Sequence, residues 1–235
     1  MKYAIIAAGM GSRLTEEGIG EPKPLVKVGG EQLIDRLIRI FLTQKASEID
    51  VICNERDVPV CQHLSILQHN RHVPLKFIVK TTASSMHSLF ELSALIGEEP
   101  FVLTTVDTIF HEHEFAEYVQ AFQQLLVTNE ADGLMAVTDF IDDEQPLYLM
   151  TDDAMNITAF KDDDPQPHFI SGGIYGLTPC SMNTLYDCIA RGESRMRNFQ
   201  RALITDGVRL KAFPFSKILD VDHAADIEKA NQFLL

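Results

Sequence analysis

The sequence predicts an α/β fold with a mixed, mostly parallel central sheet and helices on both faces. Three observations support this prediction. In the first half of the chain, apolar runs of strand length alternate with segments of helical length, as in parallel sheets with helical connections. The second half is richer in strand-like runs. The chain has 235 residues and 46% apolar content, enough for a sizeable buried core.

The first half alternates strand and helix from its beginning. Residues 3–7 are an apolar run that ends in a Gly-rich turn, which predicts a buried strand. Residues 33–42 repeat apolar side chains at helical spacing, with Asp and Arg on the other side, which predicts an amphipathic helix. The alternation continues with strands at 49–53, 75–79 and 101–106 and helices at 58–69 and 85–96. Ligands of such sheets bind at the carboxyl ends of the strands.

The second half follows a predicted helix at about 115–127. Further strands are predicted at 133–138, 146–150, 157–160, 170–176 and 208–213, and helices near 181–190, 197–205 and from about 223. The acidic segment 139–164 is expected to lie mainly on solvated loops around these strands. Because the chain has no internal repeat or linker-like tract, we expect one domain over residues 1–235.

Charge and composition narrow the range of partners. The net charge is -14, and residues 81–160 contain no Lys or Arg. This distribution argues against binding to nucleic acid or to an anionic membrane surface. No apolar stretch reaches the ~18 to 20 residues of a membrane span, and the four cysteines form no CxxC pair. We therefore expect a cytoplasmic protein with small-molecule partners, and the strand-rich later segments leave room for a homodimer.

A Gly-rich loop follows the first predicted strand: Ala7, Ala8, Gly9, Met10 and Gly11. Such a turn presents backbone N–H groups to phosphate oxygens, and glycine allows the close approach. The loop is not a P-loop, because no lysine follows the second glycine. It also lacks the third glycine of the Rossmann dinucleotide motif, which disfavours a dehydrogenase.

Two cations accompany this loop. Arg13 offers a planar fork for phosphate oxygens, and Lys23, between Pro22 and Pro24, supplies a point charge on a restricted backbone. The plainer alternative is a turn with two solvated cations. We predict that the loop, Arg13 and Lys23 bind phosphate groups.

Two carboxylates are expected at the same edge of the sheet. Asp107 directly follows the apolar run 101–106, and Asp222 lies between a strand signal and the last helix. Either residue could simply cap the turn or helix that follows it. Beside a phosphate-binding loop, however, two carboxylates suit a hard cation that bridges phosphates, and Mg2+ is the expected cofactor.

These motifs together resemble a known family. Residues 4–34, with the loop, Arg13 and the Pro22–Leu25 segment, resemble the signature of the sugar-phosphate nucleotidyltransferase (nucleotide-sugar pyrophosphorylase) family. Asp107 and the segments 171–175 and 220–230 resemble later landmarks of that family. The resemblance implies the Rossmann-like nucleotide-diphospho-sugar transferase fold, with a nucleotide-binding part at about 1–110 and an acceptor-binding part at about 111–235.

The resemblance also implies an activity and residue roles. The activity is Mg2+-dependent transfer of a nucleoside monophosphate from a nucleoside triphosphate to a sugar 1-phosphate or similar phosphate monoester, with release of pyrophosphate. A phosphate monoester is already anionic, so alignment and charge neutralisation suffice for catalysis. The implied roles are catalytic for Arg13 and Lys23, nucleotide-binding for Ala7, Ala8, Gly9, Met10, Gly11, Thr82 and Ser85, acceptor-binding for Lys161 and Gly173, and metal-binding for Asp107 and Asp222.

Two other functions stay open at this stage. Residues 81–88 depart from the family pattern and resemble the phosphocholine cytidylyltransferase branch, so the alternative is a CTP-dependent enzyme acting on an alcohol phosphate such as phosphocholine. A choline pocket would use aromatic faces or carboxylates. The alternative of another class is a non-catalytic nucleotide sensor with the same fold. His111 and His113 could bind zinc, but spacing predicts no third ligand, so a solvated loop is the expectation.

Overall fold

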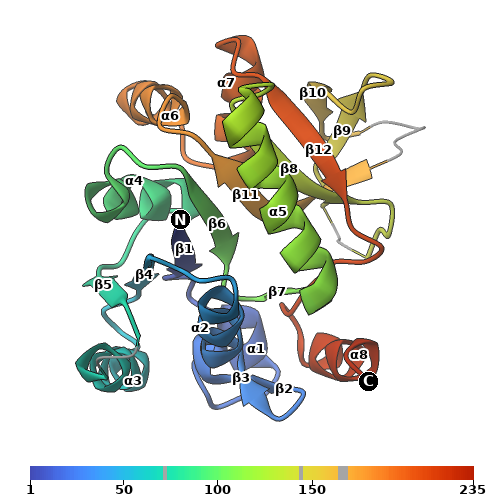
Figure 1. Cartoon of the computed structure of the whole chain (residues 1–235). Coiled ribbons are helices and arrows are strands. Elements are labelled where there is room, and N and C mark those ends of the chain that lie inside the picture. Colours follow the sequence, from blue (N-terminus) through green and yellow to red (C-terminus); the bar gives the residue numbers. More distant parts are fainter. Residues whose placement is uncertain (71–72, 143–144, 164–168) are drawn as a thin grey trace.

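A mixed sheet forms the centre of the computed structural model, which describes residues 1–70, 73–142, 145–163 and 169–235 (Figure 1). Over these residues the sheet has nine strands. Along one path they are β10 (Ile157–Lys161), β9 (Tyr148–Thr151), β11 (Phe169–Leu177), β6 (Phe101–Thr105), β1 (Lys2–Ala7), β4 (Glu48–Cys53) and β5 (Leu75–Val79). β8 (Gly133–Thr138) pairs with β11 and with β12 (Leu210–Pro214).

The strands of the first half run parallel. β1 pairs in parallel with β4 and β6, and β5 pairs in parallel with β4. β11 enters antiparallel to β6 and also pairs antiparallel with β8 and β9, which joins the second half of the chain to the first. The expected mixed α/β sheet is confirmed.

Helices cover both faces of this sheet (Figure 1). α2 (Leu33–Thr43), α3 (Val58–His69) and α5 (Glu112–Thr128) pack into the core that contains Tyr3 and Ile5. α4 (Ser85–Ile96), α6 (Ser181–Ala190) and α7 (Met196–Thr205) pack into the core that contains Ala4 and Ile6. Because successive side chains of a strand point to opposite faces, β1 supplies both cores, which explains why residues 3–7 are all apolar.

The longer predicted elements are observed with small differences at their ends. The helix predicted from about residue 115 begins at Glu112, because the acidic residues Glu112 and Glu114 suit the positive end of a helix. The strand predicted from residue 208 begins at Leu210. The N–H of Val208 instead donates to Leu203 O, 2.9 Å away, and closes the end of α7 around Gly207, whose φ is +78°.

Several short elements were not predicted, because they contain too few residues for a periodic pattern. They are α1 (Ser12–Glu16), a 3-10 turn at Lys23–Leu25, the β2 (Lys27–Val28) and β3 (Glu31–Gln32) hairpin, and β7 (Thr108–Ile109), which pairs antiparallel with β13 (Leu219–Asp220). The predicted last helix is α8 (Ala224–Phe233). Residues 143, 144 and 164 of the predicted acidic segment lie outside the described residues.

In the described parts of the chain, no helix is both long and apolar enough to cross a membrane. All four cysteines are free thiols, and the Sγ atoms of Cys53 and Cys61 lie 3.6 Å apart.

Strand β4, which lies between β1 and the edge strand β5, buries a carboxyl group, Asp50. Its side chain is fully buried, and neither oxygen has a hydrogen-bond partner among the described residues. Asp50 is flanked on the sheet by Ala4 of β1 and Lys76 of β5. Burial raises the pKa of Asp50 to about 7, and the nearby negative charge of Glu48 adds to the rise, while Lys2 and Lys76 act against it.

This buried carboxyl makes stability depend on pH. In the unfolded chain its pKa is about 3.9, so the folded protein holds a proton that the unfolded chain loses between about pH 4 and pH 7. This group therefore lowers the free energy of unfolding as pH rises through that window, and its cost is constant above it. The side chain of Asp50→Asn is always neutral. We predict that the free energy of unfolding of this variant, relative to that of the parent protein, is about 2 to 3 kcal/mol higher at pH 8 than at pH 5.

Urea unfolding at the two pH values measures this gain. Asp153→Asn, a change at an exposed carboxylate, is the control and is expected to give the same difference from the parent at both. A pH-independent difference for Asp50→Asn would contradict the prediction.

Candidate active site

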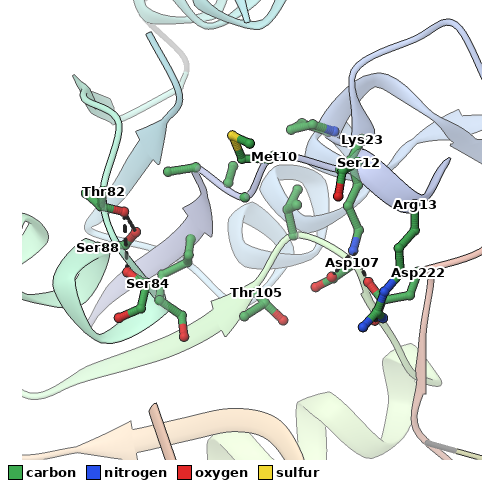
Figure 2. A pocket seen from close by; sticks show the side chains of 18 of the residues that line it. Met10, Ser12, Arg13, Lys23, Thr82, Ser84, Ser88, Thr105, Asp107 and Asp222 are labelled. Atoms are coloured by element: carbon green, nitrogen blue, oxygen red, sulfur yellow. Dashed lines mark hydrogen bonds and ion pairs between the residues drawn. The ribbon is translucent and has the colours of Figure 1, made fainter. Parts of the chain in front are cut away.

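A cavity of about 360 Å³ lies at the carboxyl ends of β1 and β6. We call it the main cavity. Figure 2 shows that it has two ends of different chemistry, with Arg13, Lys23, Asp107 and Asp222 at the charged end and Thr82, Ser84 and Ser88 at the hydroxyl end. Its lining includes all the residues predicted to contact the triphosphate or a metal: Ala7, Ala8, Gly9, Met10, Gly11, Arg13, Lys23, Thr82, Ser85, Asp107 and Asp222.

Different structural features explain the glycines at positions 9 and 11 of the loop. A Cβ added at Gly9 would meet no atom within 4 Å, so the backbone there faces open space. Gly11 has a φ of +58° as the chain turns into α1, and a Cβ there would lie 3.1 Å from Lys23 Cβ. The left-handed backbone and the close approach of Lys23 both favour glycine at this position.

The short β7–β13 ribbon brings the two carboxylates together. Asp107 immediately precedes β7, Asp222 follows β13, and the N–H of Val221 donates to Asp107 O at 3.1 Å. Two strand ends far apart in the sequence thereby place their carboxylates on one side of the main cavity (Figure 2).

Lys23 lies between these carboxylates. Its Nζ donates to Asp107 Oδ2 and, at 2.6 Å, to Asp222 Oδ1. Arg13 Nη1 donates to Asp222 Oδ2 at 3.0 Å. The side chains of Lys23 and Asp107 are only 10% and 18% exposed, compared with 53% for Arg13 and 43% for Asp222. Lys23 and Asp107, which we call the inner pair, are therefore shielded from water and form the stronger interaction. The ion pair between Arg13 and Asp222 is exposed and is screened by solvent.

This geometry fixes the charges of the inner pair. Burial alone would lower the pKa of Lys23, but the carboxylates of Asp107 and Asp222 outweigh it and raise that pKa. Burial alone would raise the pKa of Asp107, but the Lys23 ammonium outweighs it and holds that pKa below its usual value. Lys23 is thus a cation and Asp107 an anion at neutral pH.

The two carboxylates suit a divalent cation in one respect. Asp107 Oδ1 is buried and has no hydrogen-bond partner among the described residues, so one carboxylate oxygen is left for another ligand. Over the same residues, no group of three or more His, Cys, Asp or Glu side chains is arranged to hold a metal. Mg2+ is commonly bound by one or two carboxylates together with water and substrate phosphates. The donor set therefore fits a cation that arrives with a triphosphate.

The hydroxyl end is built by the N-terminus of α4 and the segment before it. The Oγ atoms of Thr82 and Ser88 lie 2.7 Å apart, and Ser84 caps the helix by accepting from the N–H of His87. His87 Nδ1 bonds to Ser84 Oγ at 2.9 Å and does not line the cavity. These hydroxyls can donate to or accept from a base or ribose, so they suit the non-phosphate part of a nucleotide.

A buried side chain that the sequence did not single out joins the two ends. Asn54 is 2% exposed and follows β4. Its Nδ2 donates to Ala8 O at 3.0 Å, and its Oδ1 accepts from Thr81 Oγ1 at 2.8 Å. A single amide thus holds the Gly-rich loop against the segment that leads to the hydroxyl end. Its place directly after a buried strand is the only sequence signal for this role.

An adjoining cavity shares Ser84, Ser85 and Thr105 with the main cavity. It measures about 360 Å³ and contains the predicted acceptor-binding residue Gly173. Its other lining residues include Ser171, Tyr175, Arg195, Arg197, Gln200 and Asp220. The side chain of Arg195 makes no hydrogen bond or ion pair with any of the described residues, so none of them occupies its guanidinium.

The second predicted acceptor-binding residue is placed differently. Lys161 is exposed at the end of β10 and is not among the described residues that line the main cavity, the adjoining cavity or a third cavity near Arg13 and Asp222. The third cavity, of about 290 Å³, lies beyond Arg13 and Asp222 and includes Phe140, Asp142 and Lys229. The role predicted for Lys161 stays a prediction.

Other candidates have structural partners. The ring centroids of His111 and Phe233 lie 4.1 Å apart, and His111 also stacks with His113. Among the described residues, the two histidines belong to no group of three metal ligands. Arg197 and Arg201 both pair with Asp162, at 2.8 and 2.6 Å. Arg195 differs from these neighbours because it lines the adjoining cavity and has no side-chain partner among the described residues, and the Arg-rich sequence around it gave no means of singling it out.

Known proteins resemble this chain over its whole length. Residues 3–172 match the family described as MobA-like NTP transferase domain. The UTP–glucose-1-phosphate uridylyltransferase AglF of Haloferax volcanii is 24% identical, and the match covers 100% of this chain and 96% of that protein.

Two solved structures share the fold. A Bacillus anthracis protein described as a glucose-1-phosphate thymidylyltransferase superposes with a TM-score of 0.84 at 19% identity, covering 99% of this chain and 94% of its own. The inositol-1-phosphate CTP transferase of T. maritima superposes with a TM-score of 0.75 at 17% identity, covering 98% and 96% of the two chains.

The close approach of Gly11 and Lys23 gives a prediction about the loop. Gly11→Ala is expected to lower the free energy of unfolding by about 1 to 2 kcal/mol because of its left-handed backbone. It should also lower the affinity for a nucleoside triphosphate by roughly tenfold or more, a cost of about 1.4 kcal/mol, because the methyl group displaces Lys23.

Gly18→Ala is the matched control. Gly18 also has a positive φ, +89°, but a Cβ there would meet no atom within 4 Å. Urea unfolding and nucleotide titration compare the two variants. Equal nucleotide affinity in both would show that the contact with Lys23 is unimportant.

Proposed function

The chain belongs to the family of MobA-like NTP transferase domains, and we propose that it transfers a nucleoside monophosphate from a nucleoside triphosphate to a sugar phosphate or similar ring phosphate, releasing pyrophosphate. The observation that supports this most strongly is the meeting of the Gly-rich loop with Arg13, Lys23, Asp107 and Asp222 at one end of a cavity. A second cavity adjoins it and is lined by Arg195, whose side chain has no partner among the described residues. One site thus provides for a triphosphate and for a second anionic substrate.

The reaction needs alignment more than acid–base chemistry. An oxygen of the acceptor phosphate forms a bond to the α-phosphorus of the nucleotide, and the bond from that phosphorus to the bridging oxygen breaks as pyrophosphate leaves. The acceptor oxygen is already anionic, so no base has to remove a proton. The loop amides and Arg13 hold the β- and γ-phosphates, and Lys23 stabilises the charge that develops around the α-phosphorus.

We propose Mg2+ as the cofactor, held by Asp107 and Asp222. When bound, Mg2+ would neutralise phosphate charge and orient the leaving pyrophosphate. The proposal is supported by the unpartnered Asp107 Oδ1 and by the position of both carboxylates beside the loop.

The adjoining cavity favours a hydroxylated acceptor. Two arginines, Arg195 and Arg197, line it together with hydroxyl and amide groups of Ser171 and Gln200. Guanidinium groups suit a phosphate and repel a quaternary ammonium group. A phosphate on a polyhydroxylated ring therefore fits this cavity better than phosphocholine. We assign the acceptor phosphate to the side of Arg195, with Gly173 beside it. The predicted contact of Lys161 with the acceptor is not supported, because Lys161 is not among the described residues that line the adjoining cavity.

The adjoining cavity disfavours the alternative that the protein is a non-catalytic nucleotide sensor. A protein that only binds a nucleotide has no use for a second cavity that adjoins the main cavity and is lined by an arginine with no partner among the described residues. A cytoplasmic location and a homodimer stay predictions.

A pyrophosphate-release assay tests the proposed function. The protein is incubated with Mg2+, each common nucleoside triphosphate including dTTP, and glucose 1-phosphate, inositol 1-phosphate or phosphocholine. We expect release with at least one ring phosphate and one preferred base, and none when Mg2+ is chelated. Release with phosphocholine alone would support the alcohol-phosphate alternative, and no release over a wide acceptor panel would support the sensor.

A substitution in the adjoining cavity separates acceptor binding from nucleotide binding. We predict that Arg195→Gln raises the KM for the acceptor roughly 10- to 100-fold, the equivalent of one charge-assisted hydrogen bond, and leaves the KM for the nucleoside triphosphate nearly unchanged. Steady-state kinetics measure both constants.

Arg191→Gln is the matched control, because Arg191 is half exposed and pairs with Glu193 outside the cavities. Lys229→Gln probes the third cavity, which Lys229 lines. If Lys229→Gln raises the acceptor KM and Arg195→Gln does not, the acceptor binds in the third cavity.

A further inference from the structure

Three of the four oxygens of the two carboxylates are already bonded to cations of the chain itself. Lys23 Nζ holds Asp107 Oδ2 and Asp222 Oδ1, and Arg13 holds Asp222 Oδ2. Only Asp107 Oδ1 is without a partner among the described residues. A divalent cation that bridged both carboxylates would therefore have to enter where the Lys23 ammonium lies (Figure 2).

The backbone keeps Lys23 in this position. Pro22 and Pro24 flank it, the 3-10 turn is closed by bonds from Leu25 N to Pro22 O and from Val26 N to Lys23 O, and its Cβ lies against Gly11. The carboxylates are fixed from the opposite side by the β7–β13 ribbon. Neither partner of the inner pair can move far without breaking backbone contacts. The ammonium can leave the carboxylates only by rotation of its own side chain.

Charge balance opposes the entry of a cation alone. The formal charges of Lys23, Arg13, Asp107 and Asp222 sum to zero, and the inner pair is shielded from water. An added divalent cation would bring two uncompensated positive charges and would displace an ammonium with no anion to receive it. A triphosphate changes this balance, because its oxygens can accept from both Lys23 and Arg13.

We propose that Lys23 is a built-in counter-ion that excludes free divalent cations from Asp107 and Asp222 until a triphosphate draws its ammonium away. The inference rests on the proposed function only for the identity of the triphosphate. It makes metal and nucleotide binding strongly cooperative, and linkage requires the cooperativity to be reciprocal. It also adds a role for Lys23 before chemistry begins, as the group that prevents a metal from binding without its nucleotide.

Binding of Mn2+, followed by the electron paramagnetic resonance of the free ion, tests this without any turnover. The parent protein should bind Mn2+ weakly alone, and at least about tenfold more tightly with an α,β-methylene nucleoside triphosphate. Lys23→Met, which keeps the aliphatic stem and removes the charge, should bind Mn2+ alone at least about tenfold more tightly than the parent. Lys27→Met, a change at an exposed lysine of β2, is the matched control and should behave as the parent.

Two further measurements keep the outcome clear. The Lys23→Met variant leaves Asp107 without a counter-ion. The Tm of this variant should therefore rise on addition of Mn2+ by several degrees more than the Tm of the parent. Adding Asp107→Asn to Lys23→Met should abolish both the Tm rise and the tight binding. Absence of pyrophosphate release would count against the proposed function and leave these results unaffected.

Two results would overturn the inference. One is that the parent binds Mn2+ alone as tightly as Lys23→Met does. The other is that Lys23→Met, shown to be folded by its circular dichroism spectrum and cooperative melting, gains no affinity for Mn2+ over the parent.

Discussion

The ammonium of Lys23 between the carboxylates of Asp107 and Asp222 is the interaction on which the rest of the site depends. Two like charges, from strand ends far apart in the sequence, can be held together away from water only with a cation between them. The β7–β13 ribbon, the proline-flanked turn and the left-handed Gly11 each position one participant. This cluster stabilises the site, and it is also the cluster that a triphosphate and its cation would rearrange.

The position of this cluster also indicates which part of the two cavities suits each part of the substrates. The charged end contains fixed charges and loop amides, which suit phosphate groups and have no means of distinguishing one base from another. Hydroxyls of Thr82, Ser84 and Ser88 occupy the opposite end, where selection of a base would occur (Figure 2). The acceptor is assigned to the adjoining cavity with Arg195. Asn54, bonded to both Ala8 and Thr81, keeps the phosphate end and the base end in a constant relation.

The sequence predicted the parts of this arrangement that depend on strand order. Parallel strands end at one sheet edge, so the loop after residue 7 and Asp107 could be expected together, and they are. Contacts made by elements of two or three residues could not be predicted, because β7 and β13 have no periodicity. The bond between Lys23 and both carboxylates depends on that ribbon. Asp50 escaped notice for another reason: a single Asp in a strand normally faces water, and its burial depends on the surrounding elements.

A crystal structure of the complex with Mg2+ and a non-hydrolysable nucleoside triphosphate would examine the rearrangement at atomic detail. We expect the metal to be bound by oxygens of Asp107, Asp222 and the phosphates. Lys23 Nζ should have moved from the carboxylates to a phosphate oxygen. A complex in which the triphosphate is bound while Lys23 still bridges the two carboxylates, or in which the metal lies away from them, would contradict this expectation.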